Sequence, residues 1–302
     1  METETAKRGT LTKILAVSTL VVLVLLAVLT FLSLSYFEEN PKDRLASQDE
    51  DPLELPEDSE PPAEETAPLP TEPPLLNLPL NPYSELDFQF EGRYLKCLRT
   101  ETITGIDVSA HQQEVDWASV KASGVEYAMI RIGYRGYESG KLVLDPYAEA
   151  NLVGAAEAGI ETGVYFFSQA LSVEEAQEEA EFVLDAIQDY EISMPVVYDW
   201  ENVHDANART NGMDARTLTD CALTFLKCIG EAGYTPMIYF NSYQSQNLLY
   251  LEELKDYDFW LAMYTSRMDF PYRVKMWQYT DQGRVPGISG NADINIYFPE
   301  VG

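Results

Sequence analysis

Two acidic residues stand one residue apart near the middle of the chain. Asp199 and Glu201 close the apolar run of residues 194–201. In a β-strand, side chains at positions i and i+2 point to the same face, with Cα atoms about 6.6 Å apart. Two carboxyl groups on the same face of one strand resemble the acid–base pair of a glycosidase. The rotamers of such a pair reach either the retaining or the inverting separation, so the spacing leaves the stereochemistry open.

Two further aspartates lie in other apolar runs. Asp107 is near the end of residues 103–109, and Asp293 lies within residues 291–297. Alone, each could be a helix N-cap or a loop hydrogen-bond acceptor. Clustered carboxylates destabilise a fold unless one is protonated, so four acids brought together favour a functional site. A metal cage is the alternative to acid–base chemistry.

Aromatic residues concentrate near the same predicted strand ends. The faces of sugar rings stack on such side chains, although aromatic residues also fill barrel cores. The predicted substrate-binding residues are Tyr165, Phe167, Tyr239, Tyr264, Trp277 and Gln278.

Eight short apolar runs alternate with amphipathic segments from about residue 100 onward. The predicted strands are residues 103–109, 125–132, 160–167, 194–201, 235–240, 258–264, 273–279 and 291–297. The predicted helices are residues 114–123, 146–158, 172–190 and 214–232. Apolar strands covered by helices predict a parallel sheet, and eight of them predict a closed barrel with its chemistry at the C-terminal strand ends. Because the last three strands lack helical connections, we expect an α/β fold in the form of an irregular TIM-like (β/α)5β3 barrel.

The first part of the chain has the composition of a membrane anchor. Residues 14–37 contain no charge, and a helix of that length covers roughly 36 Å, enough to span a bilayer. Lys7, Arg8 and Lys13 precede it, so residues 1–13 are expected in the cytoplasm and the C-terminal domain outside the cell. The alternative is a cleavable signal peptide, which would make the protein secreted.

Residues 38–99 are predicted to form a disordered linker. They are rich in proline and acidic residues, and such a segment acts as a semi-stiff spacer because proline favours extended backbone and like charges repel. The predicted order is thus a cytoplasmic N-terminus, a transmembrane signal-anchor helix, the linker, and a barrel over residues 100–302.

Charge and cysteine content exclude several classes of protein. With 20 Lys and Arg against 50 Asp and Glu, the net charge of −30 opposes binding to nucleic acid. Cys221 and Cys228 are about 10 Å apart along a predicted helix, too far for a disulfide. His111 and His204 are the only histidines, which excludes a His-rich metal site and gives little support to a Ser-His-Asp triad. We expect a monomer without cofactor or metal.

These motifs together resemble glycoside hydrolase family 25, the lysozymes, or N-acetylmuramidases. The resemblance runs through GIDVSAHQQEVDW at 105–117, YFFSQALSVEEAQEEA at 165–180, PVVYDWE at 195–201, FWLAMY at 259–264, MWQYT at 276–280 and ADIN at 292–295. It implies a (β/α)5β3 barrel and hydrolysis of the β-1,4 bond between N-acetylmuramic acid and N-acetylglucosamine. The implied partner is the glycan strand of peptidoglycan.

The resemblance also implies roles for the four acids. Glu201 matches the proposed general acid/base, and Asp199 its partner, which assists the N-acetyl group of the substrate. Asp107 and Asp293 match the aspartates of the first and last strands.

The sequence departs from the family pattern at two positions. Phe167 stands where many members carry histidine, and Trp200 where the residue is often smaller. These departures affect the shape of the sugar subsites more than the reaction. Two alternatives remain: a chitinase-like hydrolase of another N-acetylated glycan, and a non-catalytic wall-binding protein.

Overall fold

The computed structural model describes residues 76–299. The predictions for residues 1–13 and 14–37, and for the linker up to residue 75, fall outside this range and stay predictions. Within the described range, no helix combines the length and the apolar character needed to cross a membrane.

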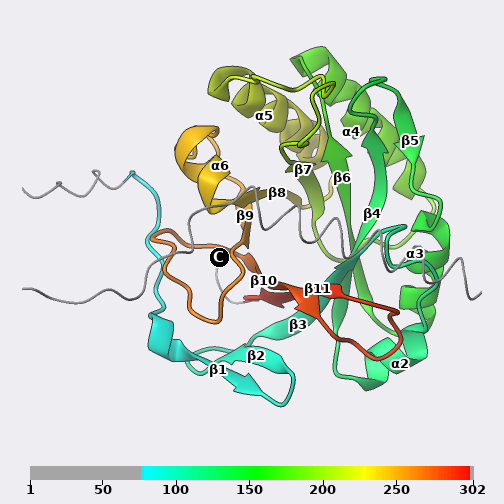
Figure 1. Ribbon diagram of the computed structural model, residues 1–302, viewed down its shortest axis with the longest axis vertical. Coiled ribbons are helices and arrows are strands. Elements are labelled where there is room, and N and C mark those ends of the chain that lie inside the picture. The colour runs from blue at the N-terminus through cyan, green and yellow to red at the C-terminus, as the bar shows by residue number, and fades with distance from the viewer. Residues whose placement is uncertain (1–75, 300–302) are drawn as a thin grey trace, which may run out of the picture. The chain divides into compact units, whose positions relative to one another are not determined.

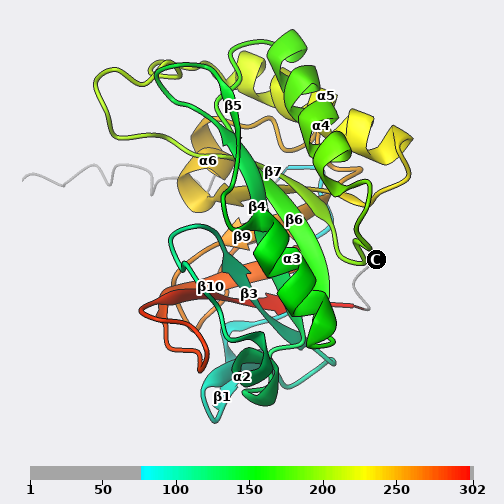
Figure 2. The ribbon, with the colours of Figure 1, turned by 90° about the vertical axis from the view of Figure 1, so that its right-hand side faces the viewer.

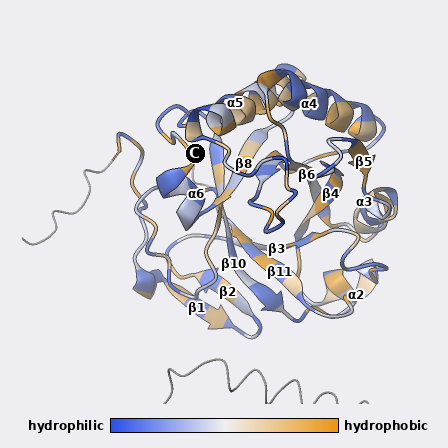
Figure 3. Ribbon diagram, turned by 45° about the horizontal axis from the view of Figure 1, so that its top comes forward, coloured by the Kyte–Doolittle hydropathy of each residue, from blue (hydrophilic) through white to orange (hydrophobic). Residues whose placement is uncertain are grey.

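Eight strands form a closed barrel (Figures 1 and 3). They are β3 (Ile103–Val108), β4 (Tyr127–Arg135), β6 (Glu161–Ser168), β7 (Val196–Trp200), β8 (Pro236–Asn241), β9 (Asp258–Ala262), β10 (Met276–Gly283) and β11 (Ala292–Tyr297). The pairings from β3 through β4, β6, β7, β8 and β9 to β10 are parallel, as predicted. Strand β11 differs, because it pairs antiparallel with both β10 and β3. The short connection between β10 and β11 contains no crossover helix, so the chain can only reverse direction.

The predicted helices form at the expected places, and an additional short helix and strand accompany them. The helices are α2 (Trp117–Ala122), α3 (Ala148–Glu157), α4 (Val173–Ile187), α5 (Ala215–Glu231) and the unpredicted α6 (Ser242–Asn247); the unpredicted strand is β5 (Leu142–Leu144), antiparallel to β4. Asp116, Ser172 and Asp214 begin α2, α4 and α5, and each side chain accepts a backbone N–H of the first turn. Gly159 and Gly233 follow α3 and α5 at φ 70° and 92°, left-handed values that suit glycine.

The helices cover only one side of the barrel. Figures 1 and 2 show α3, α4 and α5 beside β4, β6, β7 and β8, and hydrophilic and hydrophobic colours alternate along α4 and α5 in Figure 3. In the described part of the chain, no helix lies between β9 and β10 or between β10 and β11. The outer faces of the last strands therefore need another cover.

A hairpin that precedes the barrel supplies this cover. Strands β1 (Phe88–Glu91) and β2 (Tyr94–Cys97) pair antiparallel beside β10 and β3 (Figure 1). The Phe88 ring meets the Trp277 ring edge-on, with centroids 5.1 Å apart. The backbone N–H of Leu95 donates to the Tyr279 hydroxyl at 3.3 Å. The disordered linker predicted to reach residue 99 is thus wrong for the hairpin, because Phe88, Tyr94 and Leu95 are buried in the core.

Leu95→Ala is expected to destabilise the barrel by about 2–4 kcal/mol, since Leu95 is 1% exposed within the core. The matched control is Leu98→Ala, because Leu98 is 56% exposed and its loss should change stability by less than about 0.5 kcal/mol. Urea unfolding followed by tryptophan fluorescence measures both. Equal effects of the two substitutions would contradict an integral hairpin.

Candidate active site

A cavity of about 580 Å³ lies at the C-terminal ends of the barrel strands. Of the predicted site residues, those lining it are Asp107, Asp199, Glu201, Asp293, Tyr165, Phe167, Tyr239, Tyr264 and Gln278. Asp107 and Asp293 face each other as register partners of β3 and β11. Because β11 runs antiparallel, its first residues lie beside the last residues of β3.

Trp277 does not line this cavity, contrary to the prediction that it binds substrate. Its side chain is fully buried, and its indole N–H donates to the carbonyl of Met263 at 2.8 Å. Alternate side chains of a strand point to opposite faces. Gln278 therefore faces the cavity, while Trp277 packs under the β1–β2 hairpin.

We infer from their surroundings that Asp107 and Asp293 share one proton. One carboxylate oxygen of Asp107 accepts from the Gln278 amide and from the Asn295 amide, both at 2.8 Å. Burial raises the pKa of Asp293 to about 9, helped by the neighbouring charge of Asp107 and by a hydrogen bond between the two side chains. Burial also raises the pKa of Asp107, but the amide donors oppose the increase. We therefore assign the anion to Asp107 and the proton to Asp293.

Aromatic donors fix the orientation of the two amides. The hydroxyls of Tyr239 and Tyr264 donate to the Gln278 side-chain oxygen at 3.0 and 3.1 Å. The Trp260 indole N–H donates to the Asn295 side-chain oxygen at 2.9 Å. Since each amide oxygen is occupied, each NH₂ group points toward the buried carboxylate.

The surroundings of Asp199 and Glu201 raise the pKa of both carboxyl groups. Burial, then the charges of Glu201 and Asp107, raise the pKa of Asp199 well above its usual range, against an opposing effect of Arg131. Burial and the charge of Asp107 raise the pKa of Glu201. The Oδ1 atom of Asp199 is buried without a hydrogen-bond partner among the described residues. A buried oxygen without a partner is unusual in a folded protein, and here it belongs to a carboxyl group that lines the cavity.

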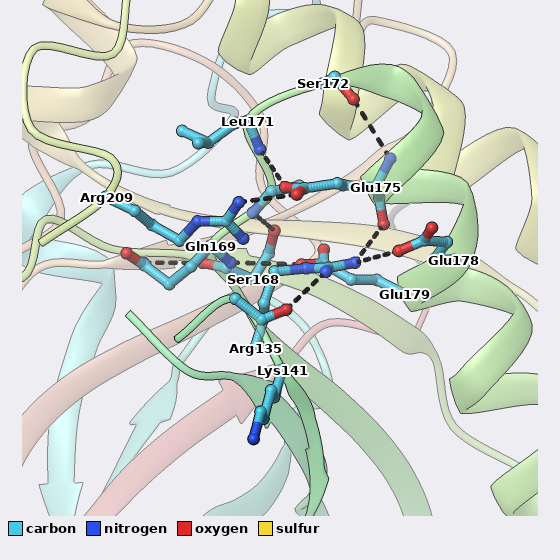
Figure 4. Close-up of polar contacts among 12 residues, drawn as sticks. Arg135, Lys141, Ser168, Gln169, Leu171, Ser172, Glu175, Glu178, Glu179 and Arg209 are labelled. Atoms are coloured by element: carbon cyan, nitrogen blue, oxygen red, sulfur yellow. Dashed lines mark hydrogen bonds and ion pairs between the residues drawn. The ribbon is translucent and has the colours of Figure 1, made fainter. Parts of the chain in front are cut away.

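The backbone of Glu201 is held by Gln169. The Gln169 amide donates to the carbonyl of Glu201 at 3.0 Å, and its oxygen accepts from the Thr210 hydroxyl at 2.6 Å. The backbone N–H of Gln169 donates to Glu179 at 3.4 Å (Figure 4). Gln169 is fully buried, so these contacts are shielded from water.

Behind Gln169, Arg135 ties β4 to α4. Its guanidinium, 4% exposed, donates to the Glu179 carboxylate at 2.8 Å and to the backbone carbonyls of Gly140 and Glu175 at 2.8 and 2.9 Å (Figure 4). Burial raises the pKa of Glu179 to about 7. Breaking one side of such a buried pair costs stability, because the other charge stays desolvated.

Several residues that line the cavity were not predicted. Arg131 donates to Asp145 at 2.8 Å, and an arginine near the end of the apolar run of residues 125–132 was an available signal. The others come from loops or from aromatic positions with no distinguishing pattern: Ser109, His111, Gln112, Tyr134, Tyr137, Val203 and Trp260. Among residues 76–299, no group of three or more His, Cys, Asp or Glu side chains is arranged to hold a metal ion.

Comparison with known proteins identifies related chains. The model of glycosyl hydrolases family 25 matches residues 106–288. The uncharacterized protein YegX of Escherichia coli (strain K12) is 28% identical over 202 residues, which cover 65% of this chain and 70% of YegX. The autolytic lysozyme of Clostridium acetobutylicum is 27% identical over 195 residues, which cover 64% of this chain and 55% of that protein.

A solved structure shares the barrel. The modular autolysin LytC from Streptococcus pneumoniae, in complex with a synthetic peptidoglycan ligand, superposes with a TM-score of 0.59 at 25% identity. The match covers 66% of this chain and 47% of LytC. The chain therefore spans about half the length of LytC and of the autolytic lysozyme.

Asp107→Asn is expected to lower the pKa of Asp293 from about 9, because the substitution removes the nearest negative charge. Titration of ¹³C-labelled carboxyl carbons by NMR measures the shift. Asp281→Asn serves as the control and should lower the pKa less, since the charge of Asp281 is a weaker cause of the increase. An unchanged Asp293 pKa in the Asp107→Asn protein would contradict the shared proton.

Proposed function

The chain belongs to glycosyl hydrolase family 25, and from this membership we propose that it cleaves the β-1,4 bond between N-acetylmuramic acid and N-acetylglucosamine in peptidoglycan. The observation that carries the proposal is the pair Asp199 and Glu201, two carboxyl groups of raised pKa in one cavity. Supporting it, one relative is named an autolytic lysozyme, and LytC was solved with a peptidoglycan ligand.

Glu201 is the proposed general acid. Its half-buried carboxyl has a raised pKa, so it retains a proton nearer to neutral pH than an exposed glutamate does. It gives this proton to the glycosidic oxygen as the bond to the anomeric carbon breaks. The hydrogen bond from Gln169 to the Glu201 carbonyl holds the acid on its strand end. The resulting carboxylate then removes a proton from the attacking water.

Asp199 is proposed to act through the 2-acetamido group of the substrate. The Asp199 carboxyl group, which lines the cavity, accepts the acetamido N–H, while the acetamido carbonyl oxygen attacks the anomeric carbon to form a cyclic oxazolinium ion. Water opens this ion with net retention of configuration. Substrate-assisted families are a recognised exception to the two-carboxylate scheme.

The sugar rings are proposed to rest on the aromatic part of the cavity. Tyr165 and Phe167 from β6 and Tyr239 from β8 lie on either side of the Asp199 strand. Tyr264, 54% exposed, stands at the mouth of the cavity. Ring faces and hydroxyl groups together suit a polar substrate with apolar C–H faces.

Glu201→Gln is expected to reduce hydrolysis of peptidoglycan by about 10²–10⁴-fold, because the amide cannot donate the proton. Turbidity of a peptidoglycan suspension measures the rate, and analysis of the new reducing end identifies the bond. The matched control is Glu157→Gln at the exposed end of α3, which should keep full activity. Full turnover by a folded Glu201→Gln protein, or a new reducing end other than muramic acid, would contradict the assignment.

De-N-acetylated glycan is expected to be a poor substrate, because it lacks the carbonyl oxygen that attacks the anomeric carbon. Turnover on matched acetylated and de-N-acetylated chains measures the difference. Comparable rates, or a glycosyl ester trapped on Asp199 and detected by mass spectrometry, would point to direct attack by Asp199.

A further inference from the structure

A second cavity, of about 570 Å³, adjoins the first. Tyr264 lines both, so its exposed ring forms the boundary between them. The second cavity is formed by the β1–β2 hairpin, the residues after β9, and the β10–β11 ribbon. The residues that matter here are Phe90, Arg93, Tyr279, Asp281 and Arg284.

Strand alternation places this cavity on the outer face of the barrel. Gln278 and Asp293 line the first cavity, while their chain neighbours Tyr279 and Ile294 line the second. The Phe90 ring, from the hairpin, meets the Tyr279 ring edge-on with centroids 6.2 Å apart, and Phe90 is 51% exposed. The cavity thus joins an apolar surface to the mouth of the candidate active site.

Two arginines line the second cavity without a carboxylate partner among the described residues, although the chain is strongly acidic. Arg93 and Arg284 are exposed, and neither forms an ion pair with any residue in 76–299. The Arg93 guanidinium donates to the carbonyl of Arg284 at 3.4 Å, which holds the two arginines together. By contrast, six other arginines have carboxylate partners: Arg99, Arg131, Arg135, Arg209, Arg216 and Arg267.

We propose that the second cavity binds the peptide stem of peptidoglycan, with stem carboxylates on Arg93 and Arg284. The inference rests on the proposed function, because the stem is carried by the N-acetylmuramic acid that the first cavity would hold. A stem of four residues reaches roughly 13 Å when extended, enough to pass Tyr264 from one cavity into the next. Guanidinium groups suit carboxylates because their paired N–H donors match the two oxygens.

The remaining lining groups fit a peptide rather than a sugar alone. Phe90 and Tyr279 offer an apolar surface for aliphatic peptide side chains. Asp281 is the acidic residue of the lining, so two positive charges face one negative charge. The site therefore favours an anionic ligand, although the chain as a whole has a net charge of −30.

The test compares two uncleaved tetrasaccharides, one bearing tetrapeptide stems with free carboxylates and one stripped of peptide. Both are titrated calorimetrically into the Glu201→Gln protein, which preserves the ligand. The peptide-bearing chain should bind more tightly. Adding Arg93→Gln and Arg284→Gln should weaken its binding about fivefold to tenfold and leave the stripped chain unchanged. Arg99→Gln is the control, since this arginine pairs with Asp87 outside the cavity.

Three results would overturn the inference: equal affinity of the Glu201→Gln protein for the two chains, an equal loss with both chains in the double arginine variant, or no loss with either. Failure of the proposed function is a separate result. It would appear as absent hydrolysis by the wild-type protein, whereas the binding comparison requires no hydrolysis.

Discussion

Four carboxyl groups cannot occupy one buried cavity as four anions, and much of the site follows from this constraint. Removing a charge from water is costly, and neighbouring like charges add to the cost. Two amide donors favour the anion on Asp107, and burial favours the protonated form of Asp293. Asp199 and Glu201 receive no comparable set of donors, so burial raises their pKa values. A cavity with carboxyl groups of raised pKa is thus a direct consequence of where the strands end.

Closure of the barrel decides which carboxyl groups meet. A parallel last strand would carry Asp293 to the end of the barrel opposite Asp107, because this residue lies near the start of β11. The short reversal after β10 inverts the strand and makes the two aspartates register partners. The same inversion brings Asn295 to the carboxylate of Asp107, where its amide donates. One antiparallel strand therefore supplies both the carboxyl group of Asp293 and the amide that stabilises the Asp107 carboxylate.

The sequence predicted the barrel well, because apolar strands and capped helices are local patterns. The Asp-Trp-Glu spacing likewise predicted that Asp199 and Glu201 share a cavity. The prediction failed at MWQYT because it assigned both Trp277 and Gln278 to the substrate site, although neighbouring side chains of a strand point to opposite faces and only Gln278 lines the cavity. Loop residues such as His111 reach the cavity through tertiary contacts that no periodicity encodes.

The β1–β2 hairpin was also missed from the sequence. Its alternating pattern was present, but the proline-rich and acidic composition around it favoured a linker. Phe88 and Phe90 alternate with polar residues before Gly92, whose φ of 64° makes the turn. The outer face of β10 requires a cover that no helix within residues 76–299 provides. Since residues 88–97 lie outside the family-matched range of 106–288, the surface beside the candidate active site is built partly from a segment peripheral to the barrel. Its side chains can change without disturbing the four carboxyl groups, because the strand wall separates the two sets.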